Sequence, residues 1–316
     1  MAIIQALAFQ GAQMLLVLLL APLLTGLVRK AKARLMRRQG PSLIQPYRDL
    51  RRLLGKDVVL AENASWLFRV VPYVICAVTW VAAALVPTFA TGLLFSWSGD
   101  LIAIIAMLGS ARFLLALAAL DIGTSFGGIG SSREVLFASL AEPAMIVLVF
   151  TVALVAGSTQ LSTIANVMFS EGLRVSLALA LFGFIIVAIA ENARIPVDNP
   201  ATHLELTMVH EAMVLEYSGR HLAMIEFAAM LKLLLYVSLI ACIFFPPGMA
   251  HGEPSLRAYA IGAGSYVVKL AVGGLLLAGF ETSIAKMRVF RVPDFLGVAL
   301  MLGLLGTLLL FVSRSL

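Results

Sequence analysis

The chain has 316 residues, of which 61% are hydrophobic and only 13% charged, and its formal net charge is +6. Charged residues make up about a quarter of a typical soluble protein, so this composition excludes a soluble globular domain and indicates an integral membrane protein. Nucleic acid binding is disfavoured, because the basic residues directly follow a membrane span and no aromatic stacking pattern accompanies them. We expect a single membrane domain over residues 1–316.

The two cysteines, Cys76 and Cys242, lie inside apolar stretches without a CxxC motif or a histidine at ligand spacing. We therefore expect no metal site, no disulfide and no cofactor on this chain. Any redox centre would belong to a partner subunit.

Hydropathy predicts an all-α bundle of about eight transmembrane helices, because about 20 apolar residues are needed to cross a bilayer. Lysine and arginine concentrate in the segments that follow the first, third, fifth and seventh spans, which the positive-inside rule assigns to the cytoplasm. Both termini are then expected outside. The predicted spans are residues 3–28, 70–92, 100–120, 134–156, 173–190, 222–246, 258–280 and 292–312.

The first cytoplasmic segment, residues 29–57, is strongly basic and is interrupted at Gly40-Pro41 and at Pro46. Leucines then recur at helical spacing among arginines, at positions 50, 53 and 54. This pattern predicts a short amphipathic helix that lies in the membrane interface. A basic, solvated loop is the alternative.

Two charged residues, Arg112 and Glu142, fall inside predicted spans, and intramembrane charges are functional by default. The glycine-rich segment 123–130 between these spans is expected to be a tightly packed loop. It does not match a phosphate-binding loop, because no Lys-Ser or Lys-Thr follows it and no strand precedes it. Further charges inside or beside spans are Glu226, Lys232, Lys269 and Glu281. They could form a chain of protonatable groups together with Glu142 and the loop acids.

The segment 190–221 holds five acids within 26 residues, in a chain with 17 acidic residues in all. Asn199-Pro200 predicts the start of a helix that extends to about residue 216, with Glu205 and Glu216 on one face and His203 and His210 on the opposite face. The HExxH zinc motif fails, because position 214 is Val. A solvated polar loop is the alternative interpretation.

Several motifs in this order resemble one family. RRQGPSLIQPYRDLRRLLGKD, ALDIGTSFGGIGSSRE, AEP, AENARIPVD and LEYSG are similar to the loops of the membrane subunit that respiratory complex I, as subunit 1 or H, shares with group 4 nickel-iron hydrogenases. The LDxGxxFxxxGxSRE form and the YRDL segment resemble most the hydrogenase-4 and formate hydrogenlyase type. Ala193 and residues 201–203 depart from the complex I pattern, which argues against a quinone site.

This resemblance implies a subunit that is not catalytic alone, joins a soluble oxidoreductase arm to the membrane arm and leads protons into the bilayer of a prokaryotic cell membrane. It also implies partners: hydrogenase large and small subunits that carry the nickel-iron centre and iron-sulfur clusters, and antiporter-like membrane subunits. The proposed proton-path residues are Glu134, Glu142, Glu191, Asp198, Glu205, Glu211, Glu216, Lys232, Lys269 and Glu281. The proposed partner-docking residues are Arg37, Arg38, Gly40, Pro41, Arg48, Asp49, Asp121, Arg133, Arg194 and Tyr217.

Three other functions remain open from the sequence. The chain could be the quinone-site subunit of complex I itself. It could be a secondary transporter, although no internal repeat is evident. It could also be a purely structural anchor, in which the acids only hold the loops.

Overall fold

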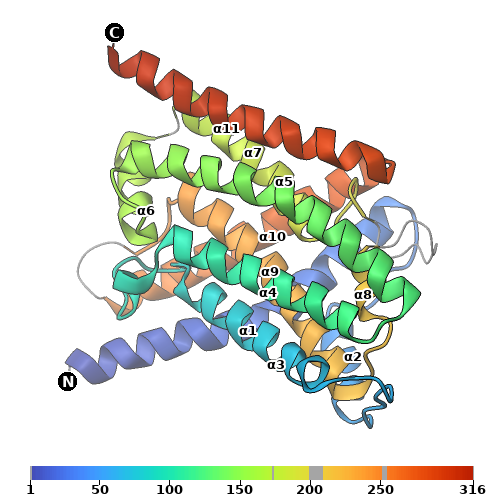
Figure 1. Cartoon of the computed structure of the whole chain (residues 1–316). Helices are drawn as coiled ribbons and strands as arrows, with labels where there is room; N and C mark the ends of the chain where they lie inside the picture. Colours follow the sequence, from blue (N-terminus) through green and yellow to red (C-terminus); the bar gives the residue numbers. More distant parts are fainter. Residues whose placement is uncertain (1, 173, 199–208, 251–254, 316) are drawn as a thin grey trace.

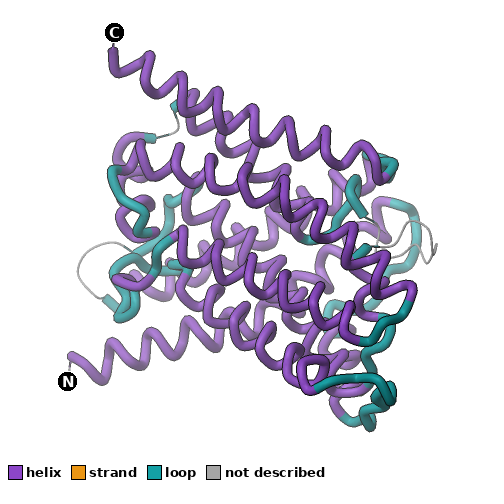
Figure 2. Tube along the Cα trace, viewed as in Figure 1, coloured by secondary structure: helices purple, strands orange, loops and turns teal. Residues whose placement is uncertain are grey.

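The computed structural model describes residues 2–172, 174–198, 209–250 and 255–315, and it consists of α-helices whose loops gather at two opposite ends (Figures 1 and 2). The described residues contain no β-strand, only two isolated bridges. The helices are α1 (Ala2–Leu35), α2 (Gln45–Leu54), α3 (Trp66–Leu85), η1 (Ser96–Ser98), α4 (Leu101–Asp121), α5 (Ser125–Ala156), α6 (Leu161–Glu171), α7 (Val175–Glu191), α8 (His210–Val214), α9 (Gly219–Phe244), α10 (Leu256–Ser283), η2 (Val289–Arg291) and α11 (Val292–Ser315).

The all-α membrane fold predicted from hydropathy is confirmed. Seven helices, α1, α3, α4, α5, α9, α10 and α11, are long and apolar enough to cross a membrane. The remaining predicted span corresponds to α7, a shorter apolar helix of 17 residues. Helix α6, which follows α5 at the same end as the termini, was not predicted.

Helix α9 is the centre of the bundle. Its most apolar window is 72% buried, whereas no other spanning helix exceeds 44%. It packs against α1 and α3, and also contacts α2, α6, α7 and α10. Helix α11 lies at the edge, against α5 and α7, and leaves a long aliphatic face open, as expected for a helix in contact with lipid (Figure 1). A charged side chain on α9 is therefore placed where several helices can supply its partners.

Both chain termini lie at one end of the bundle, and α2 and α8 lie at the other (Figure 1). This arrangement agrees with an even number of crossings. The basic segment after α1 and the acidic segment after α7 therefore share one end, which we call the loop end.

The predicted amphipathic helix is confirmed as α2. Pro46 stands in its first turn, where the missing amide donor costs nothing, and it is buried. The arginines of α2 at positions 48, 51 and 52 are exposed. Gly26 of α1 lets the segment before α2 approach, because a Cβ at this position would lie 2.3 Å from the Leu43 carbonyl oxygen. The helix is thus fixed against α1 rather than loosely tethered.

The glycine-rich segment expected as a loop is helical instead. Helix α5 begins at Ser125, and Thr124 caps it by accepting a hydrogen bond from the Gly127 amide at 3.2 Å. A Cβ at Gly127 would lie 2.4 Å from the Ala119 carbonyl oxygen, so the glycine permits a tight α4–α5 turn. The loop prediction failed because the capping threonine and the close helix contact outweigh the low helix propensity of glycine.

Of the predicted helix from about 200 to 216, the described residues 209–216 contain α8, a single turn from His210 to Val214. Residues 199–208, which include His203 and Glu205, lie outside the described residues. Glu216 follows α8 and is exposed, so the predicted pairing of faces does not extend to it. The chain leaves the helix there because Tyr217 is buried and stacks on Phe68 of α3, with ring centroids 3.8 Å apart.

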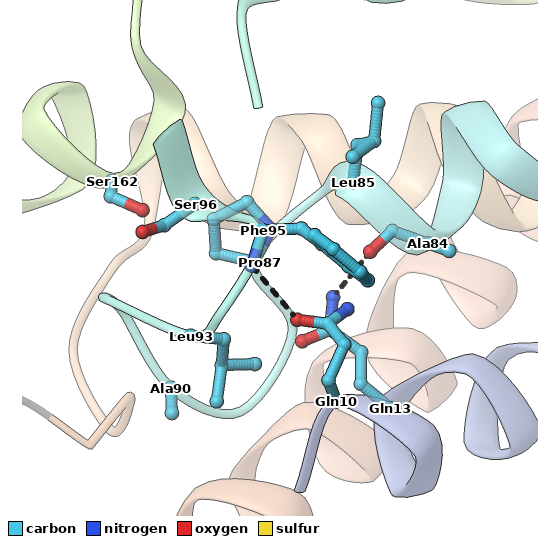
Figure 3. Close-up of a pocket in the computed structure, with 10 residues that line it drawn as sticks. All are labelled: Gln10, Gln13, Ala84, Leu85, Pro87, Ala90, Leu93, Phe95, Ser96 and Ser162. Carbon is cyan, nitrogen blue, oxygen red and sulfur yellow. Dashed lines mark hydrogen bonds between the residues drawn. The ribbon is translucent and has the colours of Figure 1, made fainter. Parts of the chain in front are cut away.

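At the end that holds the termini, two glutamines of α1 secure the connection after α3 (Figure 3). Gln13 donates hydrogen bonds to the carbonyl oxygens of Ala84 at 2.9 Å and Val86 at 2.7 Å, and Gln10 accepts one from the Phe95 amide at 3.4 Å. The cavity beside them has about 10 Å³, which is room for about one water molecule. It is too small for an organic ligand.

Candidate functional site

Five charged side chains meet inside the bundle. Arg112 of α4 donates from Nη2 to Glu142 Oε1 at 2.6 Å, and from Nη1 to Glu191 Oε1. Arg112 Nε lies 4.0 Å from Glu134 Oε1. Lys232 Nζ of α9 lies 3.2 Å from Oε2 of Glu191. We call these residues the Arg112 cluster; its three carboxylates and two cations leave one formal negative charge.

The Arg112 cluster reaches from the interior to the side of the bundle. Glu134 and Glu142 are eight positions apart on α5, which corresponds to a rise of about 12 Å. The side chain of Glu134 is 14% exposed, whereas that of Glu142 is 48% exposed. Their carboxylates turn towards the same guanidinium, which faces Glu134 with Nε and Glu142 with Nη2. A carboxylate held at the lateral surface, in the middle of a membrane helix, is positioned to face another membrane component.

Glu191 needs both of its cationic partners. It is the last residue of α7, where the helix dipole disfavours a negative charge, and its side chain is only 7% exposed. Burying a charge within a membrane costs about 3 kcal/mol even on lenient scales. Arg112 and Lys232 offset that cost, so the three residues form one electrostatic unit.

A second buried group ties the loop end to the spanning helices. Glu281, near the end of α10, has a 2% exposed side chain and lies 3.1 Å from Lys32 Nζ of α1 and 3.4 Å from Arg194 Nη1. Burial lowers the pKa of the Arg194 guanidinium, and the Glu281 carboxylate opposes that shift. A single acid therefore joins α1, α10 and the segment after α7.

Asp198 adds further contacts at the loop end. It is 4% exposed, binds Lys286 Nζ at 2.8 Å and accepts a hydrogen bond from the Val209 amide at 3.3 Å. The Met287 amide donates to the Pro196 carbonyl at 2.8 Å. These contacts hold the segment after α7 against the segment after α10, at the loop end of the bundle.

One cavity of about 550 Å³ connects the two groups. Apolar side chains of α1, α4 and α9 form part of its wall, as do Thr25 and Thr79. The ionisable side chains in its lining are Arg29, Lys32, Arg112, Glu134, Glu191, Arg194, Asp198, His210, Glu211, Glu226, Lys232 and Glu281. A hydrated cavity with this lining can pass protons between neighbouring carboxylates and can hold a medium-sized ligand.

The structure brings together most of the predicted proton-path residues. Six of them line the cavity: Glu134, Glu191, Asp198, Glu211, Lys232 and Glu281. Glu142 joins them through Arg112. Two do not: Glu216 is exposed beyond α8, and Lys269 lies on α10 next to Cys242. Glu205 lies outside the described residues.

Some predicted docking residues are exposed, whereas others are bonded to or packed against residues of this chain. Arg37, Arg38, Pro41 and Arg48 are exposed around α2, and Gly40, Asp49 and Arg133 are partly exposed.

The other predicted docking residues have partners within this chain. Arg194 is bound to Glu281, as described above. Asp121 accepts a hydrogen bond from the Ser65 amide at 3.0 Å. Tyr217 is buried against Phe68, and burial, with the nearby Asp121 charge, raises the pKa of its hydroxyl. Its place in this chain is in the packing of α3.

Three residues in the ion pairs of the site were not among the predicted proton-path and docking residues. Arg112 could have been identified from the sequence, because an arginine within an apolar helix is rare and usually paired. Lys32 and Lys286 could not have been identified in this way, since lysines at the ends of membrane helices are common. Within the part of the chain that the structure describes, no three His, Cys, Asp or Glu residues are placed to hold a metal ion.

His210 should make stability depend on pH. Burial, followed by the positive charge of Lys232, lowers its pKa from 6.5 to about 4, against the opposing effect of Asp198. The unfolded chain then binds more protons between about pH 4 and 6.5, so this stabilisation is complete above about pH 6.5 and is lost as the pH falls towards 4. We expect the melting temperature of the purified complex to rise across this range, and less steeply in His210→Gln. Parallel curves for the two proteins would contradict the assignment.

Comparison with known proteins shows the family of this chain. A sequence profile described as NADH dehydrogenase matches residues 9–312. The chain belongs to this NADH dehydrogenase family of membrane subunits, the one known in complex I as subunit 1 or H. NADH-quinone oxidoreductase subunit 8 of Rhodothermus marinus is 27% identical, over 80% of this chain and 77% of that protein. The resemblance drawn from the loop motifs is thereby confirmed.

The hydrogenase branch of this family is represented by more similar relatives. Formate hydrogenlyase subunit 4 of Escherichia coli is 35% identical over 286 residues, which cover 89% of this chain and 91% of that one. Hydrogenase-4 component C of the same organism is 34% identical, over 89% of this chain and 88% of that one. This chain is thus homologous to membrane subunits of hydrogenase type.

The fold is also shared with a solved structure. A chain of the membrane-bound sulfane sulfur reductase, an archaeal respiratory membrane complex, superposes with a TM-score of 0.80 over 95% of this chain and 99% of that chain. The two sequences are 19% identical, so the match concerns the fold alone.

Proposed function

We propose that the chain is the membrane junction of a hydrogenase-type complex, which binds a soluble nickel-iron and iron-sulfur arm at its loop end and leads protons into the membrane arm. Its similarity to formate hydrogenlyase subunit 4 and hydrogenase-4 component C, over nearly the full length of each, supports this assignment. The chain itself carries no electron in this proposal. The exposed arginines of α2 and the loop-end segments supply the docking surface.

The Arg112 cluster is the observation that carries the proposal. Protons would enter the cavity from the loop end, reach Glu134 and Glu191, and leave through Glu142 towards an antiporter-like neighbour. Arg112 stays protonated and would couple the protonation of the two acids electrostatically, because its guanidinium contacts both Glu191 and Glu142. A redox change in the soluble arm that moves the segment 192–198 would alter the charges around Glu191 and so its proton affinity.

The proposed orientation follows from the same arrangement. The loop end, with α2 and α8, would face the cytoplasm of a prokaryotic cell, and both termini would face the opposite side of the cell membrane. The excess of lysine and arginine in the loop-end segments supports this orientation.

Glu142→Gln tests the proton route. Glutamine keeps an oxygen that can accept from Arg112 but cannot carry a proton. In inverted vesicles that contain the complete complex, we expect proton movement to fall at least about tenfold, because a positioned proton donor and acceptor commonly contributes about 100-fold. Hydrogen chemistry per complex should change much less.

Glu62→Gln is the matched control, since Glu62 is exposed in the connection before α3. Proton movement that stays at the wild-type level in Glu142→Gln and in Glu191→Gln would refute the route. It would favour a purely structural anchor.

The second candidate function is a quinone site, and the size and partly apolar wall of the cavity support it. Its volume of about 550 Å³ lies within the usual range for ligand pockets, and part of its wall is apolar. The departures at Ala193 and residues 201–203 argue against it. Inhibition by quinone-site blockers, together with quinone-dependent activity, would favour this alternative over the hydrogenase-type junction.

A further inference from the structure

Lys269 is a predicted proton-path residue within a described spanning helix, but unlike Glu142 it is joined neither to the cavity nor to the Arg112 cluster. It is the fourteenth of the 28 residues of α10, so about 20 Å of helix separates it from either end. A lysine side chain is much shorter than the roughly 15 Å half-thickness of the hydrocarbon layer. The ammonium group therefore cannot extend to water or to lipid phosphates, as lysines near helix ends do.

No carboxylate of the described residues forms an ion pair with Lys269. Its ionisable neighbour is Cys242 of α9, and the nearby hydroxyls of Tyr266 and Ser238 bind each other at 2.7 Å. By contrast, Lys232 is paired with a carboxylate, as described above. Among the described residues, Lys269 is thus a half-buried cation near the middle of its helix without a carboxylate partner.

The surface beside Lys269 is an open helix face. Val272 and Leu276, three and seven positions further along α10, share its direction and are 50% and 70% exposed. Val268 is 62% exposed on the adjoining side. The main neighbours of α10 are α1 and α9. They cover the adjoining face, which carries the buried residues Tyr266, Leu270 and Gly274. Lys269 thus lies at the border between that covered face and an exposed apolar stripe, which we call the Lys269 face.

We propose that the Lys269 face is the docking surface for a transmembrane helix of another subunit, which places an aspartate or glutamate against Lys269. Charge complementarity identifies this occupant. Lipid tails cannot compensate an ammonium group, lipid phosphates lie too far away, and a second copy of this face would oppose two lysines. Intramembrane charges persist where they are paired, and the described residues offer Lys269 no carboxylate, so we assign its partner to another subunit.

The surface is distinct from the one assigned to Glu142. Glu142 lies on α5 beside α4, and neither helix is among the main neighbours of α10. The inference therefore goes beyond the proposed function. It requires a second membrane neighbour, or a second helix of the same neighbour, on another side of this subunit.

A photo-reactive amino acid at position 276, with Lys269 unchanged, tests the contact in membranes that contain the complete complex. We expect a crosslink to a transmembrane peptide of another subunit that carries Asp or Glu within one helical turn of the crosslinked residue. Crosslinks to lipid only, or to a second copy of this chain, would overturn the proposal.

Lys269→Met tests the charge. We expect the crosslinked subunit to be retained at least about tenfold less well during purification, as for loss of one partner of a buried ion pair. Lys269→Arg should retain it, and exchanging the two charges between the partners should restore it after Lys269→Glu.

Arg257→Met is the matched control, because it removes an exposed positive charge at the first turn of the same helix. Unchanged subunit ratios in Lys269→Met would refute the ion pair. If that variant failed to accumulate, the crosslink from position 276 would still decide the outcome. Failure of this inference leaves the vesicle assay on Glu142 unaffected, so the two proposals can fail separately.

Discussion

Arg112→Met should lower the thermal stability of the complex and abolish proton coupling together. The Arg112 side chain is 7% exposed and contacts three carboxylates. Its loss makes the formal charge of the cluster more negative, from −1 to −2. Removing one partner of a buried ion pair commonly costs about 3 to 5 kcal/mol, since the remaining charge stays buried and unpaired. We expect a clear drop in the melting temperature of the purified complex, and vesicles that retain hydrogen chemistry without proton movement.

A double variant separates charge from packing. Arg112→Met with Glu142→Gln returns the formal charge to −1 and should recover part of the lost stability, so the two changes should not be additive. Arg112→Lys should be intermediate, because an ammonium group cannot bind two carboxylates with the planar geometry of a guanidinium. Arg257→Met should melt like the wild type. Equal melting temperatures for Arg112→Met and the wild type would contradict the central role of Arg112.

Glu281→Gln should release the soluble arm that we propose to dock at the loop end. This side chain is 2% exposed and is the shared counter-charge of Lys32 and Arg194, so its neutralisation leaves two partly buried cations unmatched. A loss of about 3 kcal/mol, typical of a broken buried pair, would free the segment 192–198 from α1 and α10. We expect that segment to become sensitive to protease, and the soluble subunits to be depleted from the purified complex.

Glu62→Gln again serves as the control, because it removes an exposed carboxylate from another loop. Full retention of the soluble subunits in Glu281→Gln would show that this buried group does not support docking. Protease sensitivity without loss of the soluble subunits would place the docking surface elsewhere, for example around α2.

Local patterns in the sequence were sufficient to predict the membrane spans and helix α2. Apolar stretches of about 20 residues and leucines at helical spacing act through the burial of each residue, which requires no knowledge of its neighbours. The boundaries shifted where specific contacts intervened. Helix α5 begins at Ser125 because Thr124 caps it, and α8 ends at Val214 because Tyr217 packs against Phe68.

Spacing and resemblance also selected the acids of the proposed proton path, but not the residues with which they pair. The importance of Glu142 and Glu191 could be proposed from their motifs, whereas the position of Arg112 between them could not. These contacts join residues 30 and 79 positions apart, and Lys32 meets Glu281 across 249 positions. No local pattern encodes which helices pack together, so such pairs follow only from the assembled bundle.

Composition, hydropathy and loop motifs by themselves determined a multi-pass membrane subunit of this family, because insertion into a bilayer depends on side chains that each contribute independently. Only the tertiary structure decided which charges are compensated. It joined Arg112, Lys232 and three carboxylates into one cluster, placed Glu281 between two cations, and left Lys269 alone on an open face. The reason is physical: the cost of a buried charge depends on the distance to its counter-charge, and helix packing sets that distance.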